Sequence, residues 1–89
     1  MTTVLKRILP PEAELLQLAA DHWADWVGSE IAAYTRPGRI SGGTLYIYVK
    51  GSVRLAELKR HGMQSIDARV RRKAGKTIRA IRPIVDPGD

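Results

Sequence analysis

The chain has 89 residues, of which 44% are hydrophobic, and it carries no cysteine and a formal net charge of +6. Without cysteine it has no disulfide, no thiolate metal site and no cysteine nucleophile. No apolar stretch approaches the roughly 18 residues of a membrane-spanning helix, and residues 1–9 lack the apolar core of a signal peptide. We therefore expect one small domain, residues 1–89, in the cytoplasm and without a membrane partner.

Basic side chains are concentrated in the second half of the chain. Residues 1–49 carry four basic and five acidic side chains, whereas residues 50–89 carry eleven basic and four acidic ones, so the net charges are −1 and +7. With a pI near 10.2, this segregation is typical of proteins that bind the phosphates of nucleic acids. The alternative is a solvated basic face that only keeps the protein soluble.

A first helix is predicted to begin at Pro10-Pro11, because prolines followed by two glutamates suit a helix start. It is predicted to end at Thr35-Arg36-Pro37, since a residue before proline disfavours the helical region. Gly28 predicts either a kink or the close approach of another backbone. The apolar face has the three- and four-residue spacing of a helix: Leu16, Ala20, Trp23, Val27 and Ile31.

A β-hairpin is predicted at Gly42-Gly43, because two glycines between extended runs tolerate the positive φ values of a two-residue turn. The turn implies three cross-strand pairs: Ser41 with Thr44, Ile40 with Leu45, and Arg39 with Tyr46. Strand alternation assigns the side chains to two faces: Leu45, Ile47 and Val49 to the buried face, and Tyr46, Tyr48 and Lys50 to the other.

A second helix is predicted after the hairpin, with Ser52 as its N-cap and Gly75 as the residue that ends it. Gly62 is a weak point at which this helix could divide into two pieces. The last strand is predicted over residues 76–84, where imperfect alternation suggests a bulge or burial on both faces. Because strand–helix–strand crossovers are almost always right-handed, this strand should return beside the hairpin with the helices on one face. The order helix–strand–strand–helix–strand predicts a two-layer α+β fold with a three-stranded sheet, which resembles the K-homology arrangement.

The basic side chains are candidate nucleic-acid contacts. Helical spacing places several of them near one edge, where the second helix meets the last strand: Arg69, Arg72, Lys73 and Lys76. Ten of the fifteen basic residues are arginine, which suits bidentate contacts with phosphate. Like charges four residues apart mildly destabilise a helix unless an anion binds them. The predicted nucleic-acid contacts are Arg39, Lys50, Arg54, Lys59, Arg60, Arg69, Arg71, Arg72, Lys73, Lys76 and Arg79.

The aromatic residues suggest two further roles. Tyr46 and Tyr48 share the outer strand face with basic neighbours, as in the stacking platforms of several single-strand binders. Alternatively, a helix or a partner covers this face. Trp23 continues the apolar face of the first helix and is expected in the core. Trp26 lies beside that face and is a candidate surface contact for a partner protein, since tryptophan is enriched at binding hot spots.

No arrangement of residues indicates catalysis. His22 with Asp21 and Asp25 is interpreted as a solvated helix face, because a third metal ligand at a suitable spacing is missing. No serine, histidine and acid are spaced as nucleophile, base and orienting group, and residues 72–76 do not form a phosphate-binding loop. We expect no enzyme, no catalytic residue, no metal, no cofactor and no small-molecule substrate.

Short motifs follow one another between about residues 11 and 84: Trp23, Val27-Gly28, Thr35-Arg36-Pro37, Gly43-Thr44-Leu45, Ser52, Glu57-Leu58, Ile78 and Ile81-Arg82. In order and spacing they resemble those of the DciA family, bacterial proteins linked to loading of the replicative DNA helicase. The resemblance implies a K-homology-like domain that binds DNA and engages the helicase without being an ATPase. One position departs from the family pattern, because Arg54 stands where a Ser-x-Trp motif usually has its aromatic residue.

The predicted function is a non-enzymatic nucleic-acid-binding adaptor in DNA replication, which holds single-stranded or forked DNA near the replicative helicase, at the nucleoid. Two alternatives stay open. One is a K-homology-like protein that binds RNA, and the other is a protein–protein module whose basic half docks on an acidic partner.

Overall fold

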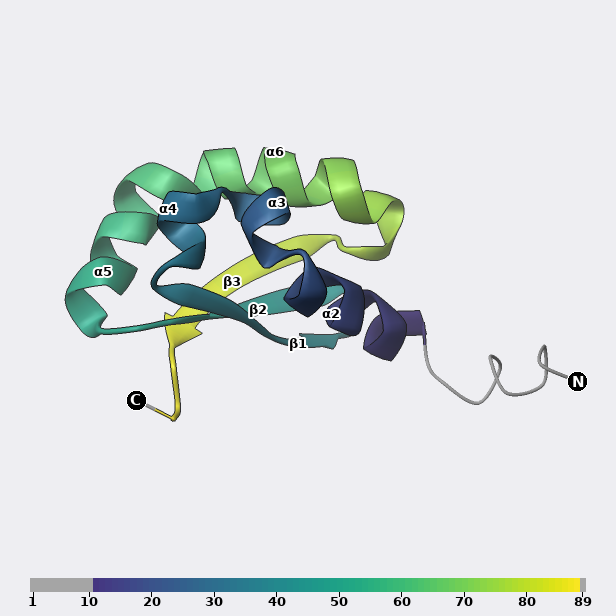
Figure 1. Ribbon diagram of the computed structural model, residues 1–89, viewed down its shortest axis with the longest axis horizontal. Coiled ribbons are helices and arrows are strands. Elements are labelled where there is room, and N and C mark those ends of the chain that lie inside the picture. The colour runs from purple at the N-terminus through teal and green to yellow at the C-terminus, as the bar shows by residue number, and fades with distance from the viewer. Residues whose placement is uncertain (1–10, 89) are drawn as a thin grey trace, which may run out of the picture.

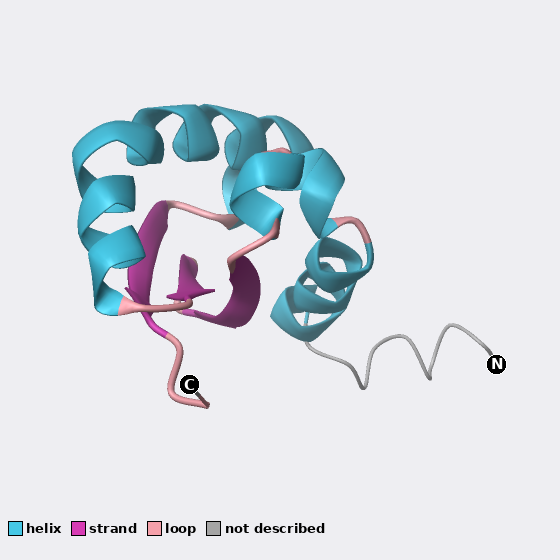
Figure 2. Cartoon of the chain, turned by 60° about the vertical axis from the view of Figure 1, so that its left-hand side comes forward, coloured by secondary structure: helices cyan, strands magenta, loops and turns pink. Residues whose placement is uncertain are grey.

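A computed structural model describes residues 11–88 and confirms the predicted α+β layout with a three-stranded sheet. The described helices lie over one face and around the ends of the sheet, and they leave the opposite face open (Figure 1, Figure 2). The elements in chain order are α2 (Pro11–Asp21), α3 (Trp23–Val27), α4 (Ser29–Ala32), β1 (Thr35–Ser41), β2 (Thr44–Val49), α5 (Ser52–Glu57), the π-helical turn η1 (Leu58–Gly62), α6 (Met63–Ala74), the 3-10 turn η2 (Gly75–Thr77) and β3 (Ala80–Val85).

The predicted first helix divides into three short helices. His22 separates α2 from α3, and Gly28 separates α3 from α4. Gly28 has φ +95° and ψ 148°, a backbone conformation that is nearly restricted to glycine. The kink at Gly28 is therefore confirmed, whereas the group that approaches this glycine is the side chain of Arg69 rather than a backbone.

The hairpin has the predicted turn at Gly42 and Gly43, both with positive φ, and the three predicted cross-strand pairs are confirmed. However, β1 already begins at Thr35, where the sequence predicted only the end of a helix. Pro37 is tolerated within it because β1 is an edge strand. The register shifts between Pro37 and Arg39, so Gly38 is an extra residue on β1.

The second helix divides near Gly62, as expected for a weak point there. The turn η1 ends at Gly62, and the Leu58 side chain occupies the space that a Cβ at residue 62 would need. The predicted N-cap is wrong, because Gly51 (φ +89°) holds the cap position and Ser52 is the first helical residue. Gly75, with φ +68°, ends α6 as predicted.

Strand β3 runs parallel to β2 at the second edge of the sheet, in the order β1-β2-β3, as the crossover predicts. It pairs with β2 without a register shift, from Thr44 with Ala80 to Val49 with Val85. The strand begins later than predicted, because η2 precedes it and Ile78 enters the core before pairing starts. This explains the imperfect alternation without a bulge in β3.

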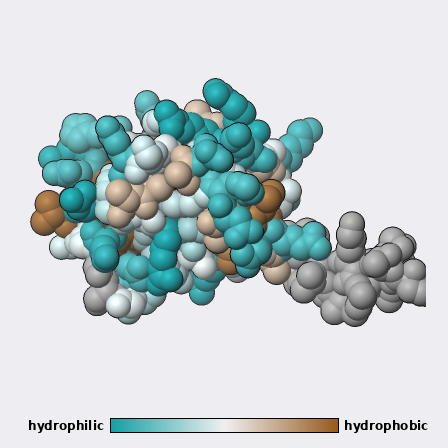
Figure 3. All heavy atoms as spheres, viewed as in Figure 1, coloured by the Kyte–Doolittle hydropathy of each residue, from teal (hydrophilic) through white to brown (hydrophobic). Residues whose placement is uncertain are grey.

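The core lies between the sheet and the helix layer. Leu45, Ile47 and Val49 of β2 are fully buried, as predicted, and they cluster with Ile66 and Val70 of α6. The outer surface seen in Figure 3 is mostly hydrophilic, with isolated apolar patches. Because the core lies on one side of β2, the side chains on its other side are left to face outward.

Candidate nucleic-acid interface

The C-terminal half of α6 presents a group of cations. Ile66 and Val70 are fully buried and fix the orientation of the helix, so the residues on the opposite side of the helical wheel face solvent. Exposed side chains from two helices line one hollow of about 290 Å³: Arg69, Arg72 and Lys73 from α6, with Asp25 from α3. Lys76 follows in η2 and is also exposed.

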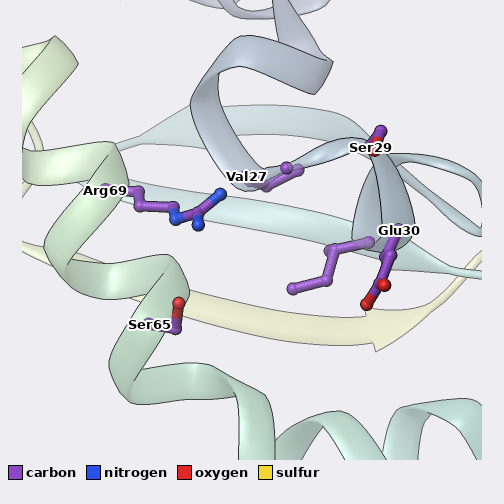
Figure 4. Close-up of a pocket in the computed structure, with 7 residues that line it drawn as sticks. Val27, Ser29, Glu30, Ser65 and Arg69 are labelled. Carbon is purple, nitrogen blue, oxygen red and sulfur yellow. The ribbon is translucent and has the colours of Figure 1, made fainter.

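Arg69 reaches from α6 to the junction of α3 and α4. Its Nη1 atom lies 2.6 Å from the position that a Cβ on Gly28 would occupy. Figure 4 shows Arg69 pointing toward Val27 across a hollow of about 430 Å³, to which Glu30 also belongs. The absence of a side chain at residue 28 therefore leaves space for the guanidinium of Arg69, and it also allows the backbone conformation of the kink.

Arg71 is an α6 arginine whose side chain makes hydrogen bonds within the protein. Its Nε donates to Asp67 Oδ1 at 2.9 Å, and its Nη2 donates to the carbonyl oxygen of Arg79 at 2.6 Å. These bonds tie the end of α6 to the segment that leads into β3. Arg71 thus supports the scaffold, and its charge already has an acidic partner.

The predicted contacts do not form one surface. All eleven are exposed, but they divide among three places: the end of α6 (Arg69, Arg71, Arg72, Lys73, Lys76), the turn η1 (Lys59, Arg60) and the surroundings of the sheet (Arg39, Lys50, Arg54, Arg79). The structure brings Arg69, Arg72 and Lys73 together, as helical spacing predicts.

Three arginines lie over tyrosine rings, within the range of cation–π interactions. The distances from Cζ to the ring centroid are 4.7 Å for Arg39 over Tyr46, 5.1 Å for Arg36 over Tyr48 and 4.7 Å for Arg54 over Tyr34. Sequence reasoning placed Tyr46 and Tyr48 on this face but missed Arg36 and Tyr34. The available signal was Gly38, since a glycine inside a strand often marks a bulge, and this one brings Arg36 opposite Tyr48.

Arg36 is held by Asp86. Its Nε and Nη2 atoms each donate to a carboxylate oxygen at 2.8 Å. This hydrogen-bonded pair lowers the pKa of Asp86 below its ordinary value of 3.8, helped by a hydrogen bond from the backbone of Gly88, and it raises the pKa of Arg36. The guanidinium over Tyr48 is thus fixed by a bidentate contact along one of its edges.

Both tryptophans are buried. Trp23 is in the core, as predicted, and its Nε1 donates to Thr35 Oγ1 at 3.0 Å. Trp26 is only 3% exposed, so its predicted role as a surface contact is wrong. The reason is helical spacing: within α3, Trp23, Trp26 and Val27 stand at i, i+3 and i+4, so they share one face of the helix and are buried together.

Residues 11–88 contain no group of three His, Cys, Asp or Glu side chains that could hold a metal ion. His22 Nδ1 lies 3.9 Å from Asp25 Oδ2, and both side chains are exposed. In the same part of the chain, no helix combines the length and the apolar character that crossing a lipid bilayer requires.

Comparison with known proteins identifies the family of the chain. No curated protein sequence matches it. The family model described as "Dna[CI] antecedent, DciA" matches residues 2–82 of the 89. The chain therefore belongs to the DciA family, which has a role in loading the replicative helicase DnaB.

Proposed function

We propose that this protein is a nucleic-acid-binding adaptor without catalytic activity, which holds single-stranded or forked DNA near the replicative helicase. Membership of the DciA family supports the role in helicase loading. We place this activity in the cytoplasm, at the nucleoid, and we propose a K-homology-like DNA-binding fold for it. The contact with DNA is argued from the residues of this chain.

The cations at the end of α6 carry the proposal. Arg69, Arg72 and Lys73 line one hollow, and none of the three belongs to an ion pair within residues 11–88. Asp25 shares the hollow and offsets only part of their charge. A DNA backbone would supply the missing anions, and arginine can bind phosphate through two parallel hydrogen bonds. We therefore assign the phosphate contact to this end of α6.

Binding measured over a range of salt concentrations tests this contact. Each neutralised phosphate contributes about 0.7 to the slope of log affinity against log salt for single strands and about 0.9 for duplex DNA. Replacing Arg72 and Lys73 with alanine should therefore weaken binding and reduce the slope by about 1.4 on a single strand.

The matched control replaces Lys59 and Arg60 with alanine. It removes the same charge from the turn η1, which precedes α6, and it should leave the slope nearly unchanged. Equal losses in both variants would show that only net charge matters and would overturn the contact at α6.

Two further measurements separate the adaptor from its alternatives. The same titration with RNA of matching sequence should show no tighter binding than with DNA, and a clear preference for RNA would favour a K-homology-like RNA binder. Purified DnaB helicase should bind the protein in the presence of DNA. If DNA binds well but DnaB does not, the adaptor role is wrong while the DNA contact stands.

A further inference from the structure

The open face of the sheet carries aromatic and cationic side chains that the contact at α6 does not use. Two cross-strand rows have a tyrosine at their centre: Arg39–Tyr46–Arg82 and Arg36–Tyr48–Ile84. The described helices lie over the other face (Figure 1, Figure 2). We propose that this open face binds single-stranded DNA by stacking unpaired bases on the two tyrosines and on the arginines over them. The inference rests on the proposed DNA-binding function and adds a second surface to it.

Each row contains a flat platform made of a tyrosine and an arginine. Arg39 lies over Tyr46 and Arg36 over Tyr48, and both arginines are exposed. Unpaired bases stack on guanidinium planes as well as on aromatic rings. A base on such a platform therefore gains stacking. Arg39, which has no ion-pair partner among the residues described, also attracts the phosphate beside the base, whereas the charge of Arg36 is already paired with Asp86.

Gly38 and Asp86 hold the Tyr48 platform in place. A Cβ on Gly38 would overlap the Tyr48 ring, so the ring packs directly on the backbone at this bulge. Asp86 binds two donors of Arg36, and its own backbone N–H donates to the carbonyl oxygen of Val49 at 2.9 Å. A platform that is fixed beforehand loses less conformational freedom when a ligand binds.

A third platform continues the surface beyond the sheet. Arg54 lies over Tyr34, beside a hollow of about 450 Å³ to which Lys50 also contributes. A second hollow, of about 130 Å³, shares Tyr34 and Lys50 and extends to Arg36 and Tyr48. The backbone N–H of Lys50 donates to the carbonyl oxygen of Tyr34 at 2.9 Å. The platforms at Tyr34 and Tyr48 therefore adjoin, with Lys50 beside both hollows. Tyr46 lies two residues from Tyr48 on the same face of β2.

The spacing of the tyrosines favours an unpaired strand. Tyr46 and Tyr48 are two residues apart, about 6.8 Å along a β-strand, which is twice the roughly 3.4 Å rise between stacked bases of one DNA strand. Bases in a duplex are stacked on one another and present only their edges, whereas a single strand can stretch and offer base planes.

The charge of this surface favours a polyanion over a neutral peptide. Among the residues described, the ion pair at this surface is that of Arg36 with the Asp86 carboxylate. Five cations border the platforms: Arg36, Arg39, Lys50, Arg54 and Arg82. Stacking planes among cations are what an unpaired strand requires.

The test replaces Tyr46 and Tyr48 together with isoleucine, which keeps strand propensity and apolar contact but removes the rings. Affinity of the full chain for a labelled oligothymidylate at near-physiological salt should fall about tenfold or more, since each stacked base contributes substantially to binding. The salt slope should be unchanged, because no phosphate contact is lost. The affinity for duplex DNA should stay within about twofold of that of the parent. On an abasic strand of equal length, the variant and the parent should bind equally.

A second measurement uses the unaltered chain, so it does not depend on the folding of a variant. Oligothymidylate that contains 5-iododeoxyuridine is cross-linked by light, and the modified peptides are mapped. We expect cross-links at Tyr46 or Tyr48, with Tyr34 as a further site. Cross-links restricted to residues 69–76, or an unchanged affinity of the double variant for the oligothymidylate, would overturn the proposal. So would tighter binding of the matching RNA, or displacement of the strand by polyglutamate as readily as by unlabelled oligothymidylate.

The Arg72→Ala, Lys73→Ala variant distinguishes this failure from failure of the proposed function. That variant should lower the salt slope and weaken the abasic strand as much as the normal one. If it does so while the tyrosine variant changes nothing, only the sheet proposal is wrong. If the tyrosine variant alone loses affinity, the phosphate contact at α6 is wrong and the sheet site stands.

Discussion

The end of α6 and the open face of the sheet both present arginines to solvent, yet they hold them differently. Arg72 and Lys73 extend from a helix toward a hollow, whereas Arg36 and Arg39 lie over tyrosine rings. An extended cation can follow a phosphate, while a stacked guanidinium presents a fixed plane. Phosphate contacts position a nucleic acid, whereas contacts with its bases distinguish a single strand from a duplex. The surroundings of each arginine therefore distinguish phosphate contact from base stacking, which the number of arginines alone does not.

The two regions share one core, and this predicts the largest effect. Ile66 is on the buried side of α6 and Ile47 is on the core side of β2, opposite the open face, and both are fully buried in the same cluster. Replacing Ile66 with alanine should lower the free energy of unfolding by about 2–5 kcal/mol, a large part of the roughly 5–15 kcal/mol that a protein has. Chemical denaturation followed by tryptophan fluorescence measures the loss.

Val53, which is 72% exposed, provides the control, because its replacement by alanine should change stability by less than about 0.5 kcal/mol. In partly denaturing conditions, the Ile66→Ala variant should lose phosphate binding and base stacking together. If one activity survived without the other, the two regions would not depend on a common core.

The hairpin shows what could be predicted from the sequence. Its register follows from a two-residue turn at Gly42-Gly43 and from strand alternation, both of which are local, and the predicted pairs were correct. The same local reasoning correctly placed Gly75 at the end of α6 and the buried side chains of β2.

Arg36 shows what local reasoning could not reach. Extending the hairpin register without interruption would place Pro37 opposite Tyr48 and Arg36 opposite Val49. The extra residue at Gly38 shifts the pairing, so Arg36 faces Tyr48 instead. The burial of Trp26 is a different case, because its spacing of three residues from Trp23 places both on one helix face, and local reasoning could have predicted it.

The second prediction concerns the α6 region alone. Replacing Gly28 with alanine should destabilise the protein by about 1–3 kcal/mol, because φ +95° strains any other residue, and the new Cβ would displace the guanidinium of Arg69. The salt slope for DNA should fall, while the effect of the tyrosine substitutions should be unchanged. Thermal unfolding and salt-titrated binding measure the two consequences.

Gly42 is the matched control for that substitution. It also has positive φ, but a Cβ there would meet nothing within 4 Å. The Gly42→Ala variant should therefore show a backbone penalty of about 1 kcal/mol without a change in salt slope. An equal change in slope for both variants would mean that Arg69 is not positioned by the space at Gly28.

The third prediction is the counterpart on the sheet. Gly38 has no positive φ, so alanine there acts only through its Cβ, which would push the Tyr48 ring aside. We expect a loss of about 1 kcal/mol in stability, since the half-buried ring can move, and weaker binding of single-stranded DNA with an unchanged salt slope. A variant that lowered the slope instead would place Tyr48 near the phosphates and blur the distinction between the two regions.

The smallest effect concerns the ion pair that fixes Arg36. The pKa of Asp86 is lower in the folded protein than its ordinary value of 3.8, mainly because of the hydrogen bonds from Arg36. As pH falls, the unfolded chain therefore takes up this proton first, and the folded state loses stability relative to it. The contribution of the pair is fully present above the ordinary pKa and disappears as pH falls through the lowered value.

Replacing Asp86 with asparagine should therefore lower the denaturation midpoint slightly at pH 7, and the difference from the parent should vanish in acid. The effect should also shrink with added salt, because the pair is exposed to solvent. The same substitution in an Arg36→Gln background tests the cause, since without the guanidinium it should lose most of its pH dependence. If the pH dependence persisted in that background, the backbone N–H of Gly88 or another cation, and not Arg36, would be holding the Asp86 carboxylate. The ion pair would then contribute less to the rigidity of the Tyr48 platform than its geometry implies.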